Sequence, residues 1–130
     1  MIQPPVAIAL TVCEQVIVEE KTHNVTLVNC MTRLRVRQVP SEAHRLVVHA
    51  WLAGGRGEGK IRLEWLHPET LEEILSRELP ATFPHPLQEA RATFRASLSF
   101  PVEGRYQINL LADGAVIAHR TFQVFLREEM

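Results

Sequence analysis

The chain has 130 residues and a net charge of -1, with 14 Lys and Arg residues against 15 Asp and Glu residues. Hydrophobic residues make up 46% and charged residues 22%, which excludes a disordered chain and is ordinary for a globular protein. We expect a single domain, residues 1–130, whose core is stable without metals or disulfides. Near-neutrality argues against a general nucleic-acid or membrane-surface binder, because such binders need a positive excess.

The apolar run near the start of the chain, residues 6–13, is too short to span a membrane. No Lys or Arg precedes it, so the charged start of a signal peptide is missing. Cys13 and Cys30 are too few for a secreted disulfide scaffold and do not form a C-x-x-C pair. We therefore expect a cytoplasmic protein with reduced thiols and no membrane partner.

The first half of the chain alternates between apolar and polar residues as β-strands do. Residues 6–18 predict one long strand, which a turn at 21–24 joins to a second strand over 25–39. The alternation of apolar and polar residues in the second strand changes phase near 31–34, which predicts a β-bulge or a bend there. Residues 46–52 are apolar enough for a central strand.

The turn at 21–24 also sets the expected relation of the two cysteines. It places Cys30 opposite Gln15 and diagonal to Cys13, at the edge of disulfide reach. Reduced, structural cysteines are the simpler interpretation, and whether Cys13 and Cys30 ever pair stays open.

The second half begins with a glycine-rich turn at 54–59, after which residues 61–65 alternate as a strand. Residues 71–79 fit either a short helix with a capping box or a strand whose leucines share one face. A proline-rich loop is expected at 80–86. Residues 90–100 alternate more cleanly than any other segment and predict a further strand.

The last strands, within 105–124, form a hairpin around Ala112, Asp113 and Gly114. Their apolar side chains occupy even positions on both strands, so they share a face only if the loop has an odd number of residues. A three-residue loop, with Gly114 in the left-handed region as a bulge, meets this condition. In total, seven to eight strands and at most one short helix predict an antiparallel, immunoglobulin-like β-sandwich.

Three parts of the chain carry a resemblance to known sequences: the opening hairpin at 12–28, the pair of strands around Trp51 and the glycine turn, and the closing stretch at 100–114 with 120–124. Together they resemble a bacterial family of small all-β proteins catalogued only as a domain of unknown function. The resemblance implies a β-sandwich with an extended conformation at 71–79. It implies no activity and no catalytic residue.

Residues 54–60 match the G-x-x-x-x-G-K part of a phosphate-binding loop. However, Ile61 stands where Ser or Thr should hold magnesium, and the glycines precede a strand instead of a helix whose amides would face the phosphates. We interpret this segment as a hairpin connection.

The six histidines show none of the spacings that metal sites use, and His67 and His85 each precede a proline in a turn. The sequence has no nucleophile elbow and no carboxylate pair in an apolar setting. We predict no catalytic residue, no metal and no cofactor. The alternative is a small-molecule or metal-binding protein, or an enzyme, that uses histidines from its loops.

Two features favour a non-enzymatic binding or structural module that works by protein–protein association, foremost with itself. The outward face of the last hairpin is more apolar than a solvated face requires, and the outward face of the first strand is also weakly polar. Arginines also alternate along one strand, which suits phosphate or an acidic partner as well as an ordinary solvent-exposed face. The possible interface residues are Leu111, Ile117, His119, Phe125, Arg33, Arg35 and Arg37. No aromatic residues interleave with the arginines, so nucleic acid is not favoured as a partner. The alternative is that a third layer, supplied by residues 80–87, covers an apolar sheet face.

The net charge is unevenly distributed along the chain. Residues 31–62 carry a net +5 and residues 63–90 a net -5. Two such segments can neutralise each other within one sheet, or they can present complementary patches to a neighbouring copy, which would favour a homo-oligomer.

Overall fold

The computed structural model describes residues 4–85 and 87–126, and the chain forms β-strands and no helix within them. The ten strands found there are β1 (Val6–Cys13), β2 (Gln15–Val18), β3 (Val25–Val28), β4 (Arg33–Val36), β5 (His44–Ala53), β6 (Gly57–Leu66), β7 (Glu73–Phe83), β8 (Ala90–Leu98), β9 (Gly104–Ala112) and β10 (Ala115–Leu126). The predicted all-β class is confirmed. Across this part of the chain, no helix is long and apolar enough to cross a membrane.

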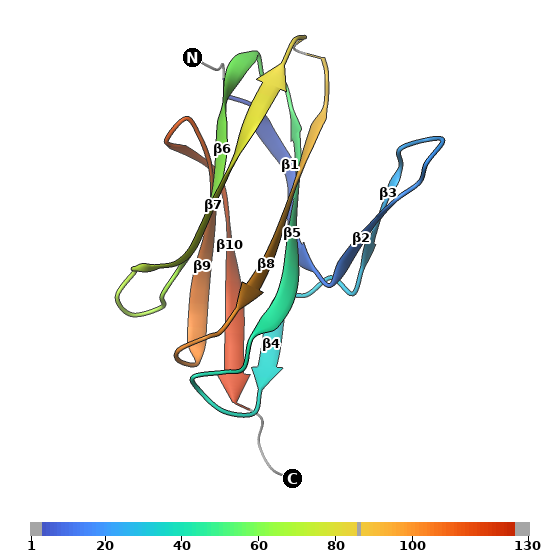
Figure 1. Ribbon diagram of the computed structural model, residues 1–130. Coiled ribbons are helices and arrows are strands. Elements are labelled where there is room, and N and C mark those ends of the chain that lie inside the picture. Colours follow the sequence, from blue (N-terminus) through green and yellow to red (C-terminus); the bar gives the residue numbers. More distant parts are fainter. Residues whose placement is uncertain (1–3, 86, 127–130) are drawn as a thin grey trace.

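The strands form three sheets (Figure 1). One sheet has the order β1-β5-β8, and a second has the order β4-β10-β9-β6-β7. Neighbouring strands are antiparallel except β4 and β10, which are parallel. The third sheet contains only β2 and β3 and projects to one side in Figure 1. We call residues 14–30, which include β2 and β3, the arm.

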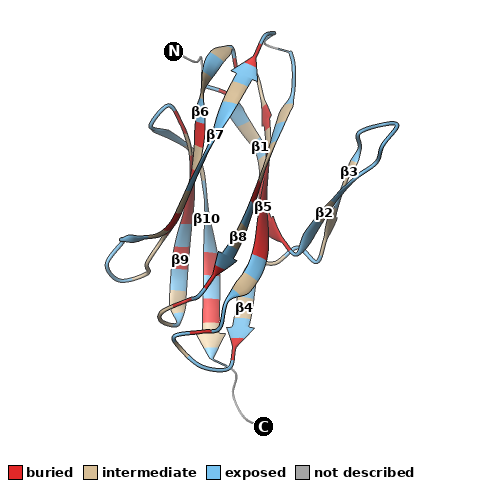
Figure 2. Cartoon of the chain, in the orientation of Figure 1, coloured by how far each residue is buried: buried red, intermediate tan, exposed pale blue. Residues whose placement is uncertain are grey.

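The three-stranded and five-stranded sheets share one hydrophobic core, which Figure 2 shows as buried stretches along their strands. Leu52 and Phe94 enter it from the first sheet, and Trp65 and Phe122 from the second. The ring centroids of Trp65 and Phe122 lie 5.0 Å apart in an edge-on arrangement, which aromatic pairs prefer. Alternation along β6, β8 and β9 therefore places their apolar residues in the core as the sequence predicts.

Tyr106, near the start of β9, lies in this core and also holds the connection from β8 to β9. Its ring is fully buried and packs edge-on against Phe100, with centroids 5.1 Å apart. The Tyr106 hydroxyl donates a hydrogen bond to the Val102 carbonyl at 2.6 Å and accepts one from the Val102 amide at 3.2 Å. These bonds fix the point at which the chain passes from one sheet to the other.

Ten strands, instead of the predicted seven to eight, result from two breaks that the apolar pattern did not reveal. The predicted strand 6–18 divides at Glu14, and the predicted strand 25–39 divides between β3 and β4. Asn29, at the second break, has a left-handed φ of 55°. Of the bulge or bend predicted near 31–34, the structure has the bend, at Thr32, where the chain leaves the arm and joins the edge of β10 as β4.

Residues 73–83 form the single strand β7, so the preference for a strand over a helix at 71–79 is confirmed from Glu73 onward. Leu71 lies in the preceding turn with a φ of 60°. The predicted proline-rich loop at 80–86 is wrong over its first residues, because β7 continues through Pro80, which pairs with Lys60 of β6. Because β7 is an edge strand, a proline without an amide hydrogen does not break the sheet.

The predicted three-residue loop of the last hairpin is also wrong. Ala112 pairs with Ala115, so the loop is the two-residue Asp113-Gly114 turn, with φ values of 44° and 87°. The register then shifts between Val116 and Ala118. This shift supplies the odd residue that the apolar pattern requires, but it lies in β10 instead of the loop.

Candidate functional site

The arm is the least buried part of the described structure. Pairing in register places Val16, Val18, Val25 and Leu27 on one face of it. No residue of the arm is buried, and on its two faces Val18 remains 55% and Ile17 46% exposed. Because an isolated two-stranded hairpin is at best marginally stable in water, its apolar side chains need contacts from elsewhere.

The base of the arm contacts the three-stranded sheet, on the sheet face that points away from the core. Cys13, Val47 and His49 lie on this face, yet all three are buried. The base of the arm covers them, so the arm supplies a third layer. Of the residues 80–87 that form the alternative third layer, 80–83 belong instead to β7 of the other sheet, and residue 86 lies outside the described residues.

Arg91 of β8 attaches the tip of the arm to this sheet. One guanidinium nitrogen donates a hydrogen bond to the His23 carbonyl at 2.9 Å. The guanidinium also lies over the Trp51 ring, 4.9 Å from its centroid, at a distance typical of a cation–π contact. Burial, and secondarily the nearby Arg91 charge, lower the pKa of His49, whose ring lies 3.3 Å from the Thr93 hydroxyl.

The base of the arm brings the two cysteines together. β2 pairs Gln15 with Val28, and an isolated bridge beyond the end of β2 pairs Val12 with Met31. The two pairs are three residues apart on both strands, so the pairing keeps the same register between them. Cys13 and Cys30 therefore lie across from each other, and the predicted diagonal placement is wrong because the turn is displaced along the chain. Both thiols are free. Burial raises the pKa of the Cys13 thiol, and the neighbouring Cys30 raises it further.

The predicted interface on the last hairpin does not form one apolar patch. Ile117, at the register shift, packs against the core, and Leu111 is half-buried. His119 is exposed. Phe125 lies six residues beyond His119 along β10, which corresponds to about 20 Å of extended strand.

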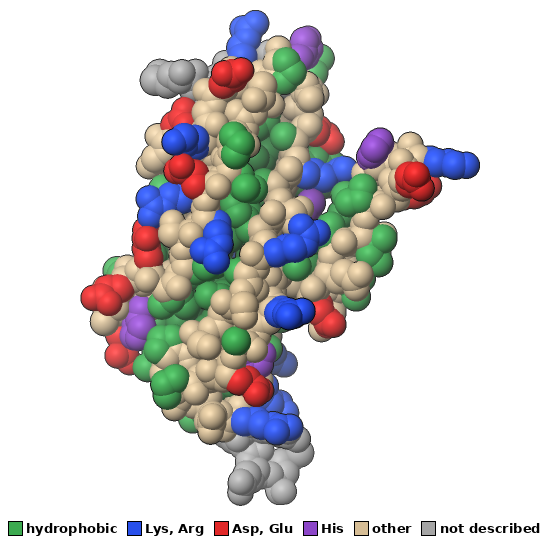
Figure 3. All heavy atoms as spheres, viewed as in Figure 1, with side chains coloured by type: hydrophobic (Ala, Val, Ile, Leu, Met, Phe, Trp, Pro, Cys, Tyr) green, Lys and Arg blue, Asp and Glu red, His purple; other side chains and the backbone are tan. Residues whose placement is uncertain are grey.

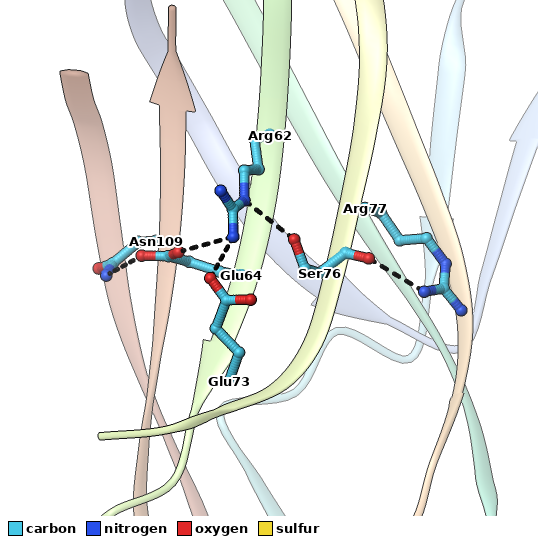
Figure 4. Close-up of polar contacts among 6 residues, drawn as sticks. All are labelled: Arg62, Glu64, Glu73, Ser76, Arg77 and Asn109. Atoms are coloured by element: carbon cyan, nitrogen blue, oxygen red, sulfur yellow. Dashed lines mark hydrogen bonds and ion pairs between the residues drawn. The ribbon is translucent and has the colours of Figure 1, made fainter. Parts of the chain in front are cut away.

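A polar network on the same face of the five-stranded sheet occupies the middle of β9, β6 and β7 (Figure 4). The Asn109 amide donates a hydrogen bond to Glu64 at 3.0 Å, and Arg62 lies 3.8 Å from the other carboxylate oxygen of Glu64. Arg62 also donates to the Ser76 hydroxyl at 2.9 Å and forms an ion pair with Glu73. The centre of this face is therefore satisfied by its own hydrogen bonds.

The structure does bring three of the predicted interface residues together at the free edge of the same sheet. The guanidinium groups of Arg33 and Arg35 of β4 both lie over the Phe125 ring, 5.8 and 5.4 Å from its centroid. Arg37 follows the end of β4 and is exposed. This cationic edge joins residues that lie far apart in the sequence.

His67, His85 and the glycine turn have structural roles. The His67 ring nitrogen accepts hydrogen bonds from the backbone of its own turn, and His85 does the same in the next loop. Among the described residues, no three His, Cys, Asp or Glu side chains gather into a set that could hold a metal. The Lys60 ammonium forms a 3.4 Å ion pair with Glu78, and its strand, β6, follows the glycines as expected.

Comparison with known sequences assigns most of the chain to one protein family. The profile of a family of unknown function (DUF6941) matches residues 8–125. A search of curated proteins finds no match. The resemblance to a family of unknown function is thus confirmed.

Proposed function

The chain belongs to this family of unknown function, DUF6941, and we propose that it is a non-enzymatic, immunoglobulin-like β-sandwich that acts by protein–protein association, first with a second copy of itself. We also propose that it works in the cytoplasm, in keeping with its two free cysteines.

Three features support the immunoglobulin-like part of the proposal. Two sheets contribute to one core, and Trp65 is fully buried in that core. The Tyr106 hydroxyl binds back to the Val102 carbonyl four residues upstream, as in the tyrosine corner of immunoglobulin-like sandwiches. This corner lies where the chain passes from the first sheet to the second, which is its usual position.

One observation carries the proposal of association: the arm has no buried residue and exposes β-branched apolar side chains on both faces. Both of its strands are edge strands, because β2 and β3 pair only with each other. A second copy offers an identical apolar arm, so two arms can bury each other in a symmetric contact. Such a contact gives the hairpin the cover that its own chain does not complete.

The chain offers a matched control for the test. Val116 of β10 is 55% exposed, as is Val18 of the arm, and Ile8 of β1 is 49% exposed against 46% for Ile17. We would measure the mass of the full chain by sedimentation velocity over a wide concentration range. The variants are Ile17→Asp with Val18→Asp in the arm, and Ile8→Asp with Val116→Asp outside it.

We expect the wild type to associate as its concentration rises, the arm variant to remain monomeric, and the control variant to associate like the wild type. A wild type that stays monomeric at every concentration would refute association. If the control variant alone becomes monomeric, the interface lies outside the arm and the assignment to the arm is wrong.

A further inference from the structure

A cavity of about 530 Å³ lies at the base of the arm, in the size range of small-ligand sites. Its lining comes from four strands: the arm contributes Gln15 and Val16, β5 residues 45–47, β8 residues 95–97, and β7 Arg77. Figure 3 shows the hollow between the arm and the rest of the molecule, with Lys and Arg side chains beside it. No motif in the sequence predicts this site, because its residues come together only through the sheet register.

The pairing of β5 and β8 explains how two arginines meet there. Arg45 pairs with Ser97, and Val47 pairs with Arg95, so the two arginines are diagonal neighbours on the face away from the core. Arg77 arrives from the other sheet. Figure 4 shows its side chain extending across the edge of β7, away from the polar network.

These three arginines have no acidic partner in the residues described, 4–85 and 87–126, and their side chains are exposed. Arg77 donates a hydrogen bond only to the neighbouring Ser76 carbonyl. The one acid in the lining, Glu14, already accepts a hydrogen bond from the Asn29 amide at 3.0 Å. The cavity therefore carries an excess of two positive charges among these residues, and an anion bound between like charges reduces their mutual repulsion.

We propose that this cavity binds a small multivalent organic anion, bearing phosphate or carboxylate groups, between Arg45, Arg77 and Arg95. Guanidinium groups match the oxygens of both groups with paired hydrogen bonds. The Ser97 hydroxyl offers a further donor, and Val16 lines the wall where an apolar part of the ligand would lie. An excess of two charges favours an anion of at least two charges over chloride or acetate.

Isothermal titration of the full chain with pyrophosphate, and separately with citrate, tests the proposal at fixed ionic strength. We expect one anion per chain, and binding weakened at least about tenfold in Arg45→Gln with Arg95→Gln, and likewise in Arg77→Gln. Arg105→Gln is the matched control, because Arg105 is an exposed strand arginine that does not line the cavity. The anion that binds more tightly identifies the preferred group.

Three results would overturn the proposal. One is that neither anion binds the wild type at millimolar concentration. Another is that Arg105→Gln weakens binding as much as the cavity variants, since that would indicate general charge attraction. The third is that an oligoglutamate peptide binds through the same arginines more tightly than both small anions, which would make the ligand an acidic protein segment. None of these variants alters the apolar arm residues, so the association test can fail or succeed independently.

Discussion

Replacing Tyr106 by phenylalanine tests whether the corner at the start of β9 holds the two sheets in place. The change removes one hydroxyl and leaves the buried ring, so it creates almost no cavity. Both hydrogen bonds to Val102, at 2.6 and 3.2 Å, are lost together. The partly buried Val102 carbonyl and amide then lose their partner, and no other partner for them is found among the described residues.

Leaving such groups unpaired costs ~1–3 kcal/mol, and we expect the free energy of unfolding to fall by about 2 kcal/mol. For a domain of this size that loss lowers the Tm by roughly 8 °C. Urea unfolding followed by tryptophan fluorescence measures the change, and an unchanged m-value would show that the unfolded state is unaffected. A loss below about 0.5 kcal/mol would show that water replaces the hydroxyl and that the corner does not hold this connection.

Further predictions concern the cysteines, one histidine and one glycine. Cys30, which is exposed, should react with iodoacetamide much faster than Cys13, whose burial raises its pKa. In a separate sample that has not been alkylated, diamide should oxidise the two thiols to a disulfide within one chain and be reduced to its hydrazine, which mass spectrometry detects as the loss of two hydrogens from the protein. In the folded chain the pKa of His49 lies below its ordinary value of 6.5, so the unfolded chain binds a proton at this imidazole more tightly than the folded chain does. The free energy of unfolding should therefore fall as the pH drops below 6.5. His49→Gln should reduce that dependence in urea titrations. Gly55→Ala should lower the free energy of unfolding by about 1–3 kcal/mol, because the added Cβ would lie 2.9 Å from the buried Phe83 ring. Thermal unfolding measures this effect, and an unchanged Tm would contradict the close packing of Gly55 against Phe83.

The all-β class and most strands could be predicted from the sequence, because each strand alternates with period two around a buried face. Segment 90–100 illustrates this: β8 covers Ala90–Leu98, and Phe94 and Leu98 face the core as the alternation requires. The same reasoning located the turns at His67 and His85, whose rings accept backbone hydrogen bonds there. In these places the local sequence is sufficient to predict the backbone structure.

The last hairpin shows where local chemistry is insufficient. The parity of its apolar residues correctly requires one extra residue between the strands, but it cannot say where that residue lies. The structure uses the compact Asp113-Gly114 turn, whose aspartate accepts a hydrogen bond from the Lys60 amide at 2.9 Å, and inserts the extra residue near Ile117. That tertiary contact between the turn and β6 is not visible in the hairpin sequence.

The predicted opening hairpin is confirmed by the antiparallel pairing of β2 and β3, but the sequence does not predict that it separates from β1 and β4 as an arm. Residues 6–18 keep one apolar face throughout, so they predict a single strand, and only the interruption at Glu14 marks the change of sheet. The cavity at its base was missed because Arg45, Arg77 and Arg95 belong to three strands of two sheets. Of the predicted interface, Arg33, Arg35 and Phe125 do meet, but through a parallel pairing that spacing along the chain does not predict.

Amide hydrogen exchange at low and high protein concentration tests the central claim, self-association through the arm, most directly. The account predicts that the backbone amides of β2 and β3 exchange quickly in the dilute protein and slowly in the concentrated one. The amides of the central strand β5 should exchange at the same rate in both. Exchange in the arm that does not change with concentration would contradict the proposal that a second copy covers it.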